Sequence, residues 1–147
     1  SNSYAYFERS QIYHTLGKYE LALNDINIAE ELNERFADHS INFIRGKILF
    51  NLGNIEDSIT SFEKEIKFKP KNVTAILWQI RAYSKTREYS RAKIYAEKLI
   101  EIDPNTARSY SILGDILLFM GELEESNKYH SLALKLDPTY KIVTKKY

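Results

Sequence analysis

The sequence contains no cysteine among its 147 residues, which excludes disulfides and thiolate metal sites. Its five glycines are spread along the chain, so it has no glycine-rich phosphate-binding loop. No apolar run approaches the roughly 18 residues that a membrane-spanning helix needs. The formal net charge of +1 provides no strong field to gather nucleic acid or an anionic membrane. We therefore expect no cofactor, no nucleic-acid partner and no membrane insertion, while the compartment stays open.

Apolar residues recur along most of the chain at separations of three, four and seven, the spacing of amphipathic helices. An early example is the run Ile12, Tyr13 and Leu16, which ends at Gly17. A second helical pattern begins two residues later, near Tyr19. Two helices joined by so short a turn lie side by side and antiparallel. The same alternation continues to the end of the chain and predicts successive helix pairs.

The three prolines, Pro70, Pro104 and Pro138, are separated by 34 residues each. Each follows an apolar run and precedes a new helical pattern. A fixed period of this length is the sequence signature of a repeat protein. Further columns keep the same register. They comprise a small residue in the first helix (Ser10, Gly46, Gly114), a turn glycine (Gly17, Gly53, Gly121), an aromatic (Tyr13, Tyr83) and a small residue in the second helix (Ala22, Ser58, Ala92, Ser126).

With these columns the sequence resembles the tetratricopeptide repeat family, whose unit is a 34-residue helix–turn–helix. The resemblance implies an all-α fold, a right-handed α-solenoid of antiparallel helix pairs. We expect one array over residues 1–147, with repeats at about 3–38, 39–72, 73–106 and 107–140 and a partial capping helix over 141–147. The chain starts without an initiator methionine, so we interpret it as a segment of a longer protein.

Four departures from the repeat pattern carry expectations of their own. Two extra residues fall within 33–37. Ile80 stands where a small residue is usual. Arg87 replaces the turn glycine, which predicts either a strained left-handed residue or a different helix ending. Glu65 occupies a position that is usually small and apolar, so we expect it to reach a cation such as Arg81 or to escape to solvent.

The family resemblance implies a concave groove lined by the first helix of each pair. That groove is expected to bind a protein or peptide partner, with aromatic and cationic side chains as anchors. Simple packing by the phenylalanines and a solvated cationic face are the alternatives. The predicted partner-binding residues are Tyr4, Phe7, Gln11, Phe43, Lys47, Asn51, Leu77, Arg81, Lys85, Arg108, Ser111 and Asp115.

One variant of the family grips the C-terminal carboxylate of chaperones with a fixed Lys–Asn–Asn–Lys–Arg set. The residues at those positions here are Phe7, Gln11, Ile44, Thr74 and Trp78, so we expect no such clamp. Catalysis and metal binding are not expected either, because His14, His39 and His130 lie in different repeats without metal-ligand spacing.

Three alternatives to a free-standing interaction scaffold stay open. The first is that the chain forms a regulatory or substrate-docking arm of a larger enzyme. The second is RNA binding, which the 34-residue period and the neutral charge disfavour. The third is self-association through the C-terminal end, unless Ile142 and Val143 cover the face formed by Leu117, His130 and Leu134.

Overall fold

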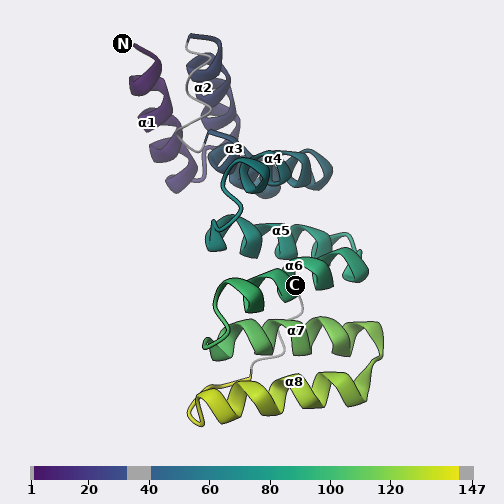
Figure 1. Ribbon diagram of the computed structural model, residues 1–147. Coiled ribbons are helices and arrows are strands. Elements are labelled where there is room, and N and C mark those ends of the chain that lie inside the picture. Colours follow the sequence, from purple (N-terminus) through teal and green to yellow (C-terminus); the bar gives the residue numbers. More distant parts are fainter. Residues whose placement is uncertain (1, 33–40, 143–147) are drawn as a thin grey trace. The chain divides into compact units, whose positions relative to one another are not determined.

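The computed structural model describes residues 2–32 and 41–142, which contain helices and no strand (Figure 1). The all-α fold class predicted from the periodicity is confirmed. The helices are α1 (Asn2–Thr15), α2 (Tyr19–Leu32), α3 (Ile41–Asn51), α4 (Ile55–Phe68), α5 (Val73–Lys85), α6 (Tyr89–Ile102), α7 (Ala107–Met120) and α8 (Leu123–Leu136).

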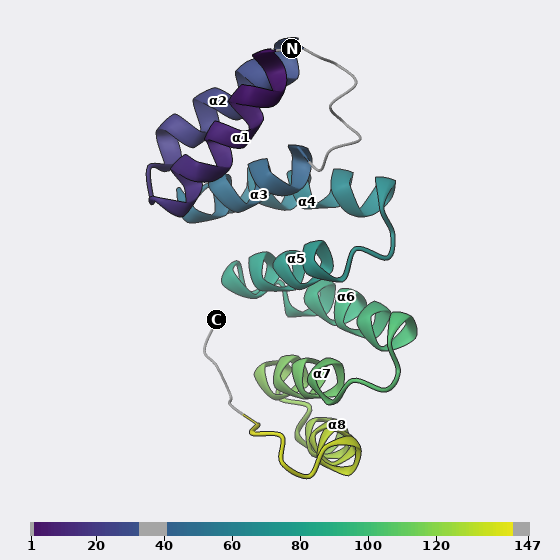
Figure 2. The ribbon, with the colours of Figure 1, turned by 90° about the vertical axis from the view of Figure 1, so that its left-hand side faces the viewer.

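The chain divides into two compact units, Ser1–Pro70 and Lys71–Tyr147. The first unit holds the pairs α1/α2 and α3/α4, and the second holds α5/α6 and α7/α8. In each unit the second helix of one pair packs on the first helix of the next, α2 on α3 and α6 on α7 (Figure 2). A single continuous array over both units stays a prediction.

The four helix pairs turn in the same way. Gly17, Gly53 and Gly121 have φ of +72°, +86° and +82°, as their turn positions predict. After each of them, the next backbone N–H donates to the carbonyl five residues back, which is the Schellman ending of a helix. Arg87 makes the same turn at φ +62° and is the one non-glycine with positive φ in the described part of the chain. The equivalent bonds are Lys18 N to Tyr13 O, Asn54 N to Leu49 O, Glu88 N to Tyr83 O and Glu122 N to Leu117 O.

Because Arg87 holds a conformation that disfavours any Cβ, Arg87→Gly is expected to stabilise the second unit by about 0.5–1 kcal/mol. Urea unfolding followed by circular dichroism measures this change. The matched control is Glu97→Gly, at an exposed position in the middle of α6, which is expected to cost about 1 kcal/mol. An unchanged or lowered stability of Arg87→Gly would show that the arginine is not strained at this turn.

In the second and fourth helix pairs, a glycine on the first helix faces a large side chain on the second, 16 residues later in the sequence. A Cβ built on Gly46 would lie 2.5 Å from the Phe62 ring, and one built on Gly114 would lie 2.4 Å from the His130 ring. In the third pair the same offset joins Ile80 to Ala96, and both are buried. The departure at Ile80 is therefore an exchange of sizes, with the large residue on the first helix instead of the second.

The structure also bears on the expectations for Glu65 and for the C-terminal capping helix. Glu65 is 1% exposed and pairs with Lys69 Nζ at 3.7 Å, so of its two expected outcomes it meets a cation rather than solvent. Lys141 and Ile142 are not helical, so the predicted capping helix does not begin at 141. The predicted insertion at 33–37, His39 and the rest of the capping segment lie outside the described residues.

Candidate functional site

The twelve predicted partner-binding residues lie on the first helices of the pairs, α1 and α3 in the first unit and α5 and α7 in the second. Tyr4, Asn51, Arg81, Lys85 and Arg108 are exposed. Partly buried positions are Gln11, Phe43, Lys47 and Leu77. Three of the twelve are buried and offer little surface: Phe7, Ser111 and Asp115 are 8%, 3% and 3% exposed. Contact of any of them with a partner stays a prediction.

In the first unit, predicted residues of α1 and α3 come together with one that the sequence did not single out. The Asn51 side-chain amide lies 2.9 Å from His14 Nε2, across the two helices. Lys47 Nζ lies 5.3 Å from the centre of the Phe43 ring, within the range of a cation–π interaction. The Phe43 ring in turn contacts Phe62 of α4, with centroids 6.2 Å apart. We call His14, Phe43, Lys47 and Asn51 the Lys47 surface.

The electrostatics of the Lys47 surface are set by a partly buried cation. Burial lowers the pKa of Lys47 below its ordinary value. The pKa of His14 is also lowered, first by burial and then by the nearby charge of Lys47. Within the described residues Lys47 forms no ion pair. A partly buried cation without a counter-charge is costly, and a carboxylate placed beside it would relieve that cost.

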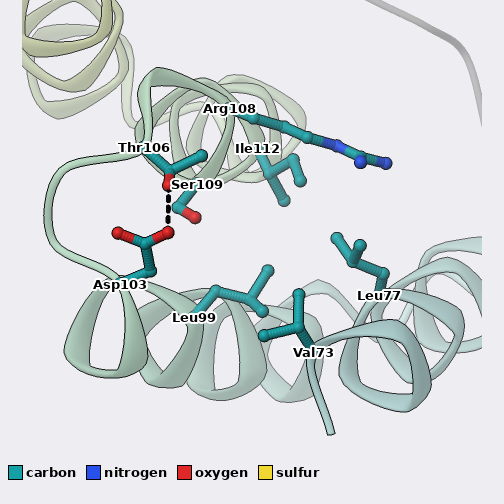
Figure 3. Close-up of a pocket in the computed structure, with 8 residues that line it drawn as sticks. All are labelled: Val73, Leu77, Leu99, Asp103, Thr106, Arg108, Ser109 and Ile112. Atoms are coloured by element: carbon teal, nitrogen blue, oxygen red, sulfur yellow. Dashed lines mark hydrogen bonds between the residues drawn. The ribbon is translucent and has the colours of Figure 1, made fainter. Parts of the chain in front are cut away.

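In the second unit, the predicted residues Leu77 and Arg108 meet at a pocket between α5, the end of α6 and the start of α7 (Figure 3). Its volume is about 120 Å³. The pocket, hereafter the α5–α7 pocket, is lined by Val73, Leu77, Leu99, Asp103, Thr106, Arg108, Ser109 and Ile112.

The α5–α7 pocket has an apolar interior and charges of opposite sign at its two ends. Asp103 lies at one end, where it accepts hydrogen bonds from the Asn105 backbone N–H (3.2 Å) and the Thr106 hydroxyl. Arg108 extends away from Asp103, over the end where Leu77 lies (Figure 3). Arg108 is exposed and forms no ion pair within the part of the chain that the structure describes. The pocket therefore places an apolar cavity next to the Arg108 guanidinium.

The other predicted residues of the second unit do not line this pocket. The Arg81 guanidinium lies 5.2 Å from the Trp78 ring centre. Asp115 Oδ1 lies 3.0 Å from His130 Nε2 on α8. Burial raises the pKa of Asp115, and the contact with His130 opposes that rise. His130 is thus a structural partner of α7.

Sequence reasoning missed several residues of both sites. The absence of metal-ligand spacing gives His14 no predicted role, although its place one turn after Gln11 puts it on the same face of α1. Val73, Leu99 and Ile112 belong to the apolar periodicity, which marks core positions and gives no sign of a pocket. No group of three or more potential metal ligands occurs among residues 2–32 and 41–142. In the same residues no helix is long and apolar enough to cross a membrane.

Comparison with protein families finds four matches to the model described as "Tetratricopeptide repeat", at residues 3–36, 39–72, 81–106 and 107–140. Three of these ranges begin where the predicted repeats begin. The third starts at Arg81 instead of Val73, which places the atypical Ile80 outside the match. These ranges cover well over half of the chain.

Individual proteins that resemble this chain also contain tetratricopeptide repeats or share its fold. The Hsp70-Hsp90 organizing protein of Triticum aestivum is 26% identical over 123 residues, which are 84% of this chain and 21% of that protein. The F-box/TPR repeat protein pof3 of Schizosaccharomyces pombe is 31% identical over 96 residues, 61% of this chain and 16% of that protein. The chain thus spans about a fifth of the length of the curated relatives it matches. A solved structure described as the crystal structure of MamA has the same fold, with a TM-score of 0.83 at 21% identity, covering 93% of this chain and 79% of that one.

Proposed function

The chain belongs to the tetratricopeptide repeat family, and from this premise we propose that it is a protein-interaction scaffold that binds partner segments on the first-helix faces of its pairs. The Lys47 surface carries the proposal. It combines an aromatic ring, a partly buried cation without a counter-charge among the described residues, and polar groups contributed by two helices. Aromatic and cationic anchors of this kind hold peptides in protein grooves. The partner segment is therefore extended and carries acidic side chains.

The proposed mode differs from a carboxylate clamp. A clamp needs several cations and amides around one chain end. This chain has Phe7, Gln11, Ile44, Thr74 and Trp78 at the corresponding positions, of which Phe7 and Ile44 are buried. A relative is named for organising two chaperones. Even so, the proposed ligand is an internal acidic segment, so amidating the peptide's C-terminus is expected to leave its affinity unchanged.

The first test selects 12-residue peptides from a phage-displayed library on the whole chain and measures the enriched peptides by fluorescence polarisation. Lys47→Glu is expected to weaken their binding at least tenfold, because it replaces an attraction by a repulsion. The matched control is Lys64→Glu on the exposed face of α4, which is expected to change the affinity less than twofold. Added salt is expected to weaken binding to the wild-type chain.

Two results would contradict the proposal. One is a selection that enriches no peptide. The other is a set of peptides that bind Lys47→Glu as tightly as the wild-type chain while circular dichroism shows equal helicity.

A second candidate function places the same scaffold inside a longer protein as the docking arm of an enzyme. The observation that favours it is length, since the matched segments are only 21% and 16% of two of the relatives. The sequence of the whole gene product distinguishes the two, because an enzyme domain beside the array supports the docking role.

A further inference from the structure

We infer that the α5–α7 pocket holds one leucine-sized aliphatic side chain of a partner segment, whose neighbouring acidic residue pairs with Arg108. This inference rests on the proposed scaffold function and adds a second, chemically defined contact in the other unit. It commits to a peptide with an aliphatic residue flanked by an acid on one side.

The size and lining of the pocket select the aliphatic group. Its volume is about 120 Å³, and a cavity of about 150 Å³ lined by apolar residues is known to hold one benzene molecule. A leucine, isoleucine or methionine side chain fits this space, whereas an indole is too large. Val73, Leu77, Leu99 and Ile112 surround the space with aliphatic carbon (Figure 3). An aliphatic side chain seated there exchanges contact with water for contact with these residues.

The two charged ends of the pocket select the flanking residue and its side. Asp103 is engaged by Asn105 and Thr106, and it repels a second carboxylate at its end. Arg108 has no ion pair among the described residues and extends over the opposite end, so its guanidinium can receive a carboxylate in a bidentate arrangement. The peptide is therefore oriented, with its acidic residue at the Arg108 end.

The position of the α5–α7 pocket favours a peptide over a small apolar molecule as its occupant. Leu77 and Arg108 lie on α5 and α7, the helices that carry the predicted binding face of this unit. A pocket on such a face is reached by a side chain of a segment that lies along it, as in other recognition grooves where main chain lies on the surface and alternate side chains enter pockets.

The test uses synthetic 12-residue peptides with a central leucine flanked by glutamate on one side, built on the sequences enriched by the library. Replacing the leucine by alanine or by tryptophan is expected to weaken binding at least tenfold. Val73→Trp, which fills the pocket from the first turn of α5, is expected to cause a loss of the same size. Ile94→Trp is the matched control, since Ile94 is 63% exposed on α6 and does not line the pocket.

Charge reversal separates recognition from a structural role. In Arg108→Glu, the glutamate-flanked peptide is expected to bind at least tenfold more weakly, and a lysine-flanked peptide is expected to bind more tightly than it binds the wild-type chain. Lys135→Glu, at an exposed position of α8, is expected to leave both affinities unchanged. Methyl NMR spectra of the wild-type chain are expected to shift at Leu99 and Ile112 and not at Ile94 when the peptide is added.

Equal binding of both peptides to Arg108→Glu and to the wild-type chain would overturn the inference. So would full binding to a folded Val73→Trp variant. If peptides still lose affinity for Lys47→Glu in either case, the scaffold proposal stands and only the pocket assignment falls.

Discussion

Gly46→Ile is expected to destabilise the first unit by about 3 kcal/mol or more, and adding Phe62→Ala to it is expected to recover much of that loss. A Cβ on Gly46 would lie 2.5, 2.7 and 2.9 Å from three carbons of the Phe62 ring. Phe62 on α4 is completely buried, so its ring can move away only by displacing other core side chains. Overpacking of such a site forces a helix or a side chain out of place.

The recovery follows from the third pair of helices, where the sizes are exchanged. Ile80 on α5 and Ala96 on α6 occupy the positions of Gly46 and Phe62, and they are 3% and 0% exposed. The double variant Gly46→Ile/Phe62→Ala recreates that arrangement in the first unit. Phe62→Ala alone is expected to cost about 3–5 kcal/mol through its cavity. The double variant is expected to cost at least about 2 kcal/mol less than the sum of the two single changes.

Urea unfolding of the four chains in this cycle measures the coupling. If a single variant is too unstable to fold, recovered helicity in the double variant is the readout. Thr60→Ile serves as the control, because it adds apolar bulk on the exposed face of α4 and is expected to change stability by less than about 0.5 kcal/mol. Additive costs in the double variant would show that the two positions do not form a packing pair.

The packing of the helix pairs also shows which features of the fold the sequence can predict. The 34-residue period, the left-handed turn at Arg87 and the close approach at Gly46 follow from local rules, because a turn residue or a small residue acts at a fixed offset from its own helices. The exchange at Ile80 was visible in the same way, since Ala96 lies at the offset of 16 that joins Gly46 to Phe62. Neither position by itself reveals the exchange, because the two sizes are complementary only when both helices of the pair are considered.

The candidate sites were less predictable for a physical reason. The contact between His14 and Asn51 and the ion pair between Arg9 and Asp25 join side chains whose approach depends on how two helices lean on each other. Periodicity fixes which face a residue occupies but not that geometry. The burial of Ser111 and Asp115 and the existence of the α5–α7 pocket have the same origin. The sequence predicts which residues share a helix face, whereas the pocket beside Leu77 and Arg108 is visible only in the structure.

Gln79→Met is expected to stabilise the second unit by about 2 kcal/mol. Gln79 lies on α5 with 0% exposure, and neither its amide nitrogen nor its amide oxygen has a hydrogen-bond partner within the described residues. A buried polar group without a partner costs about 1–3 kcal/mol, and glutamine brings two such atoms. Methionine has nearly the same length and shape, so it removes this cost without opening a cavity.

The corresponding position of the next repeat supplies a comparison. Leu113 lies 34 residues further along, on α7, and is 1% exposed. The inverse change, Leu113→Gln, is therefore expected to destabilise the unit by a similar amount or more, because it places an amide in a site built for an aliphatic side chain. Gln79→Met with unchanged or lower stability in urea would mean that the amide is satisfied in solution. Opposite signs for the two changes would show that burial of the amide, rather than loss of packing, sets the stability of this position.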